Sequence, residues 1–216
     1  MMERQTPDVK RTRNYDATRR EEQARQNRTR IVDAAERMFL CDGYTATTVV
    51  AIASTAAVSP DTIYKTFGGK PGLVRAIRDR ALEGEGTVPA EQRSDAIQAR
   101  EPDPRTIIKA WGALVAELAP RASPILLLIR DVASSDDEVR ALRDEMDAAR
   151  LRRMTENARR LRDASHLRAN ITLAQAADVL WTYSSPELYE LLVLRRGWQS
   201  KRYGHFVADA MIDALL

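Results

Sequence analysis

The apolar residues of this chain recur at helical spacing in successive segments, which are separated by short breaks rich in Gly and Pro. The first segment begins after Arg28 and stops at Gly43, and its spacings of three and four residues place the apolar side chains on one helical face. Those side chains are Ile31, Ala34, Ala35, Met38 and Phe39. The pattern predicts a first helix of about four turns.

A second helix is predicted at about 48–55 and a fourth at about 71–83. Thr47 or Thr48 caps the second helix, because a threonine hydroxyl accepts a hydrogen bond from a free N–H at a helix start. The apolar side chains of this helix are Val49, Ile52 and Ala53. Pro71 suits the first position of the fourth helix.

A short third helix is predicted at about 59–66 from its first three residues. Ser59 is a favourable N-cap, Pro60 suits the first helical position, and Asp61 interacts favourably with the positive end of the helix. Two glycines, Gly68 and Gly69, end it.

Residues 84–104 differ in composition from the segments around them, since they hold five Gly and Pro residues among scattered charges. They are interpreted as a linker with about one turn of helix. Helices are predicted to resume at 105–119, 124–134, 136–163, 172–184, 186–196 and 200–216. Because no segment stands out with the period-two alternation of a strand, the predicted fold class is all-α.

The pattern divides the chain into four parts. Residues 1–27 are a polar, basic arm, expected to be disordered or to form a frayed helical extension. Residues 28–83 form a first helical domain, residues 84–104 the linker, and residues 105–216 a second helical domain.

Composition narrows the class of protein. The chain has 216 residues, of which 44% are apolar and 30% charged, as in a soluble globular protein. One cysteine excludes a disulfide framework and a thiolate zinc cluster, and two histidines exclude a His-rich metal site. The longest strictly apolar runs, such as Ile125–Ile129, are too short to span a bilayer, and the N-terminus has no apolar signal segment. We expect a protein of the reducing cytoplasm without a membrane partner.

The net charge of +3 is unevenly distributed. Residues 1–30 hold nine basic and five acidic residues, whereas the rest of the chain holds 25 and 26. A basic arm on a near-neutral body fits a polyanionic partner that is met at one end. The alternative is a solvated tail without a partner.

The two short helices at 48–55 and 59–66, joined by a tight turn, match a helix-turn-helix unit. In such a unit the second helix enters the DNA major groove and its first turn faces the base edges. The candidates for base readout are Ser59, Pro60, Asp61, Thr62 and Lys65. Tyr64, Lys65 and Lys70 are candidates for phosphate contacts, Lys70 with the free N–H groups of the fourth helix. A plain helical hairpin remains the alternative.

The same segment resembles the N-terminal domain of TetR-family transcriptional regulators. The matching residues are Arg30-Ile31-Val32, Ala34-Ala35, Phe39, Gly43-Tyr44, Thr47-Thr48, Ile52-Ala53, Val58-Ser59, Thr62-Ile63-Tyr64, Phe67, Lys70 and Leu73. The resemblance implies that Thr48, Tyr64 and Lys70 contact phosphates, with Thr47 beside them, and that the first residues of the third helix read bases. It also implies that Phe39, Ile52, Ala53 and Phe67 belong to the core.

Two positions depart from the family pattern. Ala57 stands where the family has Gly in the turn, so either a positive φ there costs about 1 kcal/mol or the turn differs slightly. Gly68 and Gly69 precede Lys70 where at least one non-glycine residue is common, which suggests a looser joint with the fourth helix.

The long helix at 136–163 carries the candidate ligand site. Its apolar face, formed by Val139, Leu142, Met146 and Ala149, continues into three polar residues. These are Arg150, Arg153 and Asn157, which are costly to bury without partners and therefore could line a cavity that binds a polar or anionic group. Alternatively, the arginines lie at the surface or pair with acidic neighbours. Trp111, Arg130 and Trp181 are candidates for the same cavity, or simply core residues.

No catalytic or metal site and no cofactor is expected. His166 and His205 have no patterned partner, Cys41 is interpreted as an inert thiol, and we found no nucleophile, phosphate-loop or paired-carboxylate motif.

Helices 172–184 and 200–216 carry apolar stripes with small residues, and the resemblance implies that such helices pair with their copies in a homodimer. The predicted function is a ligand-responsive regulator, in the first place a repressor, which binds a pseudo-palindromic DNA operator and is released by a small-molecule effector. The alternatives are an all-α ligand-binding protein or enzyme that no longer binds DNA, and a nucleoid-like protein without sequence preference.

Overall fold

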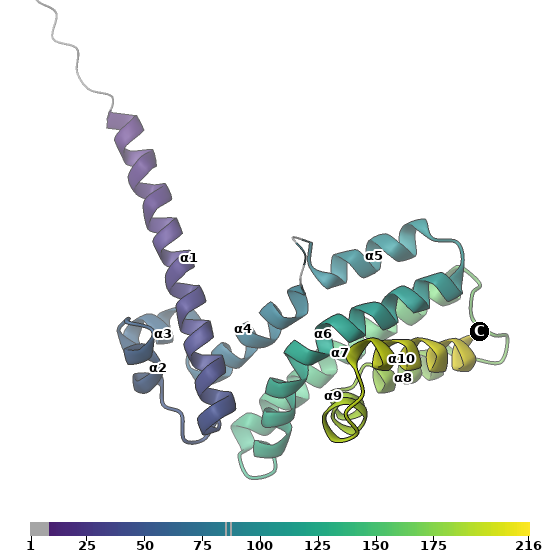
Figure 1. The fold of residues 1–216 in the computed structure, drawn as a ribbon. Helices are drawn as coiled ribbons and strands as arrows, with labels where there is room; N and C mark the ends of the chain where they lie inside the picture. The colour runs from purple at the N-terminus through teal and green to yellow at the C-terminus, as the bar shows by residue number, and fades with distance from the viewer. Residues whose placement is uncertain (1–8, 85, 87) are drawn as a thin grey trace, which may run out of the picture.

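The computed structural model describes residues 9–84, 86 and 88–216, and Figure 1 shows that they are helical with short connections. The predicted all-α class is confirmed. The elements are α1 (Val9–Asp42), α2 (Val49–Thr55), α3 (Pro60–Phe67), α4 (Lys70–Glu83), α5 (Ala90–Arg100), α6 (Pro104–Val132), α7 (Asp137–Asp163), α8 (Leu173–Tyr183), α9 (Pro186–Tyr189), a π-helical turn η1 (Glu190–Arg195) and α10 (Ser200–Leu215).

Helix α1 is longer than the apolar pattern indicated. It begins at Val9 and projects away from the rest of the molecule (Figure 1). Of the two expectations for the arm, the helical extension is the one that residues 9–27 adopt, while residues 1–8 lie outside the described residues. No Gly or Pro interrupts residues 9–42, and side-chain pairs one turn apart, such as Glu22 with Arg25, stabilise an exposed helix.

A first cluster of buried apolar residues joins α1–α4 to the end of α6 and the start of α7. Its fully buried members include Phe39, Ile52, Ile63, Leu73, Ile77, Ile125 and Ile129. The helix-turn-helix segment and the second domain therefore share one core, rather than meeting through a flexible connection.

The predicted linker, residues 84–104, contains a helix of eleven residues, α5, where about one turn of helix was expected. Tertiary ion pairs hold this helix against its neighbours. Arg93 binds Glu117 of α6 through two hydrogen bonds, and Asp95 binds Arg153 and Arg160 of α7. Sequence composition does not show these partners, because they lie 24 to 65 residues away.

Helix α6 is continuous where two helices were predicted, and both Pro120 and Pro124 lie inside it. An interior proline costs about 3 kcal/mol, so packing along the whole helix must offset it. Ile107 and Ile108 of α6 belong to a second buried cluster with α7, α8 and α10, while Ile125 and Ile129 belong to the first.

Helices α6 and α10 approach each other at two glycines. A Cβ on Gly112 would lie 2.4 Å from the Gly204 carbonyl oxygen, and a Cβ on Gly204 would lie 2.5 Å from the Gly112 oxygen. Although α6 is long and apolar enough to cross a membrane by length and composition, it is a core helix of this fold.

The apolar stripes of the C-terminal helices pack largely within the same chain. Ala176, Ala177 and Leu180 of α8 are buried, as are Tyr203, Val207, Met211 and Leu215 of α10. The large apolar side chains left exposed in this region are Leu191, Leu194 and Phe206. Most of the stripe residues thus belong to the core of the same chain, while Phe206 is exposed and Leu173, Ala210 and Ala214 are partly buried.

Candidate functional site

Helices α2 and α3 form the predicted helix-turn-helix geometry. The Thr48 hydroxyl accepts a hydrogen bond from the Ala51 N–H at 3.1 Å, and the Ser59 hydroxyl accepts one from the Thr62 N–H at 3.2 Å. Both predicted caps are therefore present. Between the helices, Ala57 has φ of 53°, as the departure from Gly in the family pattern implied. The turn keeps its shape with a strained alanine.

Most of the candidate DNA-contacting residues lie on the outer surface of this unit. Ile63 points into the core, whereas most of the candidate side chains on either side of it in the sequence face solvent. Thr48, Ser59, Asp61, Tyr64 and Lys65 are exposed, and Pro60 and Thr62 are half-buried. Val50 is a further exposed apolar side chain on α2 that the sequence reasoning missed. It falls off the stripe of Val49, Ile52 and Ala53, which is the signal that could have found it.

Thr47 is a correction to the candidate DNA-contacting residues. It is only 2% exposed, and its hydroxyl donates to the carbonyl oxygens of Gly43 at 2.8 Å and Met38 at 3.2 Å. A buried side chain with both bonds inside the domain cannot reach a phosphate. Thr47 closes the end of α1 against α2, and Thr48 alone is the cap.

Lys70 is engaged inside the protein rather than extended toward solvent. Its Nζ donates to the carbonyl oxygens of Tyr44 at 2.7 Å and Thr47 at 3.1 Å, and lies 4.1 Å from the centre of the Tyr44 ring. Burial lowers the pKa of the Lys70 ammonium. These bonds tie the start of α4 to the α1–α2 loop, so the joint after Gly69 is bonded and not simply loose.

Gly72 is a residue of this joint that the sequence reasoning missed. A Cβ there would lie 1.6 Å from the Phe67 carbonyl oxygen, so the close approach of α3 and α4 requires a glycine.

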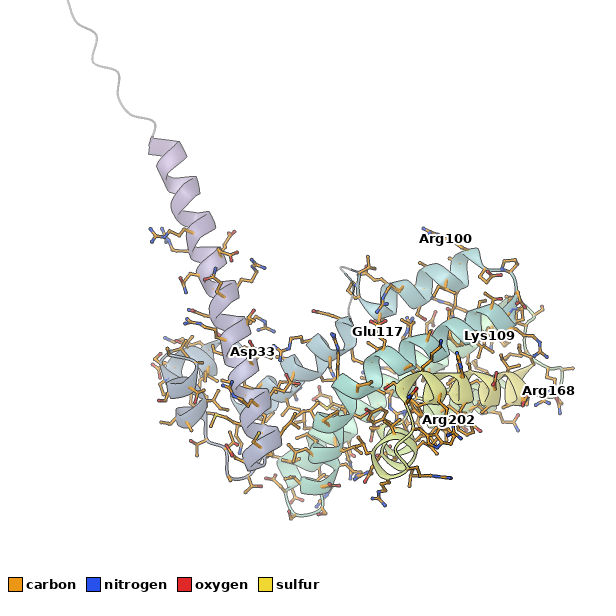
Figure 2. The ribbon with its side chains drawn as sticks, viewed as in Figure 1. Asp33, Arg100, Lys109, Glu117, Arg168 and Arg202 are labelled. Atoms are coloured by element: carbon orange, nitrogen blue, oxygen red, sulfur yellow. The ribbon has the colours of Figure 1, made fainter. Side chains whose placement is uncertain are left out.

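Helix α4 connects the helix-turn-helix unit to the second domain through ion pairs at both sides. Arg80 pairs with Asp33 and Glu36 of α1, and Figure 2 shows Asp33 on the α1 surface. Arg75 makes two hydrogen bonds to the Glu145 carboxylate of α7, at 2.9 and 2.5 Å. The bonds to Arg75 lower the pKa of Glu145. A change at α7 can therefore reach α1 through α4.

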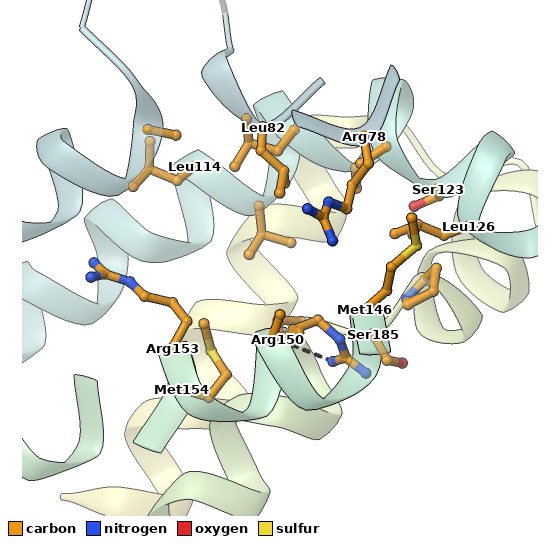
Figure 3. A pocket seen from close by; sticks show the side chains of 18 of the residues that line it. Arg78, Leu82, Leu114, Ser123, Leu126, Met146, Arg150, Arg153, Met154 and Ser185 are labelled. Carbon is orange, nitrogen blue, oxygen red and sulfur yellow. Dashed lines mark hydrogen bonds between the residues drawn. The ribbon is translucent and has the colours of Figure 1, made fainter. Parts of the chain in front are cut away.

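A cavity of about 720 Å³ lies among α4, α5, α6, α7 and the start of α9. Figure 3 shows Arg78, Leu82 and Leu114 facing Arg150 and Met154 across it. Its apolar lining is formed mainly by Leu82, Leu114, Val115, Leu118, Ala119, Leu126, Ile129, Met146, Met154 and Leu180. A volume of this size accommodates a drug-sized organic molecule.

Five of the six predicted ligand-site residues line this cavity. They are Trp111, Arg130, Arg150, Arg153 and Asn157. Trp181 is the correction, because it is not among the lining residues. Its ring instead lies against the Arg150 guanidinium, 4.4 Å from the ring centre, and so supports that side chain from behind.

The lining arginines differ in how their charge is balanced. Arg130 lies 2.7 Å from both Glu190 and Asp131, and Arg153 lies 2.7 Å from Asp95 and 3.2 Å from Glu91. Arg153 therefore both lines the cavity and forms ion pairs, so the two interpretations made from the sequence coexist.

Arg150 differs from the other two arginines in its partners, which are mainly neutral groups. It donates to the Trp181 carbonyl and, at 3.3 Å, to the Ser184 hydroxyl. The carboxylate of its ion pair, Asp147, lies 3.5 Å away, and burial lowers the pKa of the guanidinium.

Three residues that line the cavity each carry a buried polar atom with no hydrogen-bond partner among the described residues. These are Ser94 Oγ, Trp111 Nε1 and Asn157 Oδ1. Buried polar groups are normally satisfied, so these atoms mark places where a bound molecule or water would form hydrogen bonds. Ser94 was missed because it lies in the segment interpreted as linker.

The remaining candidates are isolated. Cys41 is exposed, and the described residues hold no group of three or more His, Cys, Asp or Glu side chains that could bind a metal ion.

Comparisons with known proteins agree with this geometry. Residues 31–77 match the family model described as bacterial regulatory proteins, tetR family. The chain is 30% identical over 115 residues to the uncharacterized HTH-type transcriptional regulator YvkB of Bacillus subtilis, which covers 53% of this chain and 57% of YvkB. It is 40% identical over 65 residues to the regulator TtgR of Pseudomonas putida, which covers 30% of this chain and 31% of TtgR.

Solved structures share the fold over most of the chain. NalD, described as the secondary repressor of the MexAB-OprM multidrug efflux pump in Pseudomonas aeruginosa, is 20% identical with a TM-score of 0.70 over 90% of this chain and 98% of NalD. A complex of SmeT with triclosan is 20% identical with a TM-score of 0.64 over 88% and 91%. The sequence matches to YvkB and TtgR span less than two thirds of those proteins. The family model identifies residues 31–77 as a TetR-family helix-turn-helix domain, and over most of its length the chain shares the fold of solved proteins such as NalD and SmeT.

Proposed function

We propose that this protein is a cytoplasmic, homodimeric repressor that binds a pseudo-palindromic DNA operator and is released from it by a small-molecule effector. The observation that carries the proposal is the exposed face of α3, with Asp61, Tyr64 and Lys65, directly after the capped turn from α2. In a helix-turn-helix unit this helix enters the major groove. Its first turn reads bases, and Tyr64 and Lys65 contact phosphates.

The cavity beside α4 supports control by an effector. SmeT is seen with triclosan, and NalD is described as a repressor of an efflux pump. In this chain α4 is bonded to α1 through Arg80 and to α7 through Arg75. A ligand that prefers a different separation of α4 and α7 shifts the position of α3 and lowers the affinity for DNA.

Dimerisation sets the spacing of two α3 helices on the operator. Leu191, Leu194 and Phe206 are large exposed apolar side chains close to α10, and they support a contact between copies of the chain. Two recognition helices separated by about 34–36 Å would enter successive major-groove faces.

The N-terminal helix contributes to DNA affinity in this proposal. Residues 19–27 are almost entirely exposed and carry Arg19, Arg20 and Arg25. Among residues 19–27, whose burial is described, none is buried, so deletion of residues 1–27 should leave folding and dimerisation intact. It should reduce the affinity for DNA and the slope of log K against log salt. Equal slopes for the full-length and shortened chains would show that the arm does not contact DNA.

A salt series of gel shifts tests the proposal. The DNA upstream of the gene itself should bind with a log K that falls linearly with log salt, and a palindrome from it should compete better than random DNA. Absence of DNA binding at low salt would favour the alternative of a ligand-binding protein, for which the cavity alone suffices. Equal competition by random DNA would indicate nonspecific binding.

A further inference from the structure

The charged side chains around the cavity differ in their exposure to solvent. The carboxylates at its edge face solvent, since the side chains of Asp147, Glu187 and Glu91 are 47%, 48% and 68% exposed. The Arg150 side chain is only 18% exposed. Charges in solvent are screened, whereas a buried charge acts at a lower effective dielectric constant. The lining holds five arginines and five acidic side chains, and the least exposed of these charges belong to arginines, so the balance of charge in the interior favours an anion.

Arg150 is the lining arginine with the weakest carboxylate partner among the described residues. Arg78, Arg130, Arg143 and Arg153 each have a carboxylate oxygen within 2.7 Å, whereas Asp147 lies 3.5 Å from Arg150. Its fixed bonds go to neutral groups, the Trp181 carbonyl and the Ser184 hydroxyl. Both bonds use Nη1, which leaves Nε and Nη2, the nitrogen 3.5 Å from Asp147, to bind an incoming oxyanion.

The rest of the cavity is apolar and extends along α7. Asn157 lies seven residues beyond Arg150 on α7, which corresponds to about 10 Å of helix. Met154 lies between them, and Leu114, Val115 and Leu118 line the wall that α6 contributes. A ligand that fills this space is apolar over most of its length.

From these observations we propose that the effector is an amphipathic organic anion, with its carboxylate or similar oxyanion on Arg150 and its apolar body along α6 and α7 toward Asn157. The inference rests on the proposed function only in calling the ligand an effector. The anion would lie opposite Arg78 of α4, as Figure 3 shows for the two side chains. Binding would thus act on the helix that connects to the DNA-binding unit.

The test compares three probes of equal chain length on the full-length protein without DNA: decanoate, decan-1-ol and decyltrimethylammonium. Binding is measured by calorimetry and by the fluorescence of the tryptophans, because Trp111 lines the cavity and Trp181 stacks on Arg150. We expect decanoate to bind about tenfold or more tightly than the alcohol, since charge-assisted hydrogen bonds contribute at this level, and the cation to bind least. Equal or reversed ranking, or no binding of decanoate at millimolar concentration, would overturn the proposal.

Two variants locate the anion. Arg150→Gln should make decanoate and the alcohol bind equally, whereas Arg152→Gln, an exposed arginine of the same helix, should keep the preference. An unchanged preference in Arg150→Gln would refute the assignment of the site. If circular dichroism shows that Arg150→Gln does not fold, Arg150→Lys replaces it and should retain only part of the preference.

Gel shifts with the same probes separate this inference from the proposed function. Binding of decanoate without release of DNA supports the anion site and contradicts its role as an effector site. DNA binding by a protein that ignores all three probes supports the regulator and contradicts the anion site.

Discussion

Replacement of Lys70 by methionine tests whether this lysine holds the fold or binds DNA. In the structure its ammonium donates to the carbonyl oxygens of Tyr44 and Thr47, and removal of the ammonium leaves both without this donor. Hydrogen bonds from a charged group contribute about 1.5–3 kcal/mol each in mutational series. Part of this is offset by the cost of burying the ammonium, which is why burial lowers the pKa of Lys70.

We therefore expect Lys70→Met to lower the free energy of unfolding by about 2 kcal/mol. For a chain of this length that corresponds to a decrease of about 4–8 °C in Tm. Urea unfolding followed by circular dichroism measures the change. Any change in the DNA affinity of Lys70→Met should result from displacement of the α1–α2 loop.

Lys65→Met is the matched control, because Lys65 is exposed on α3. It should leave the Tm unchanged and reduce the slope of log K against log salt by about one. If Lys70→Met instead kept the wild-type Tm and reduced the slope of log K against log salt, the structural role derived from the two carbonyl contacts would be refuted.

Three further outcomes follow from contacts elsewhere in the fold. Gly112→Val should destabilise the protein by about 1–3 kcal/mol or prevent folding, because its Cβ would meet the α10 backbone, whereas Ala113→Val on the exposed side of α6 should unfold like the wild type. Burial raises the pKa of Tyr44 from 10.0 to about 12, so between these pH values the folded state keeps a proton that the unfolded state loses. The free energy of unfolding should therefore fall between pH 10 and 12, by at most about 2.7 kcal/mol. Alkaline unfolding curves of Tyr44→Phe should lack this decrease. Arg75→Gln should lower the free energy of unfolding by less than about 1 kcal/mol, because the ion pair of Arg75 with Glu145 is partly exposed. The same variant should weaken effector-induced release of DNA in gel shifts. Release at the wild-type effector concentration would rule out this ion pair as the link between the cavity and the DNA-binding unit.

Several parts of this protein could be predicted from the sequence because the interactions that create them are local. The caps at Thr48 and Ser59 and the glycine stop at Gly68 act within one helical turn, so the helix-turn-helix boundaries follow from a few adjacent residues. The 3.6-residue period likewise places Arg150 and Asn157 on the inward face of α7, and both line the cavity. The positive φ of Ala57 was expected from the resemblance alone, because the family has Gly at this position.

Other features depend on partners that are distant in the sequence, and only the tertiary structure decided them. Composition indicated a break at Pro120 and Pro124, yet packing of α6 into both cores maintains one helix. The residues of α5 resemble a linker until Arg93 and Asp95 meet charges on α6 and α7.

The same distinction holds within the candidate site. Thr47 and Thr48 are adjacent and chemically identical, but the end of α1 buries one and leaves the other as an exposed cap. Lys70 lies at a helix start, where a free cation was expected, and the carbonyl oxygens that bind it come from 23 and 26 residues earlier. A local pattern determines which face of a helix a side chain occupies, whereas its desolvation and its bonding partners depend on which other segments cover that face.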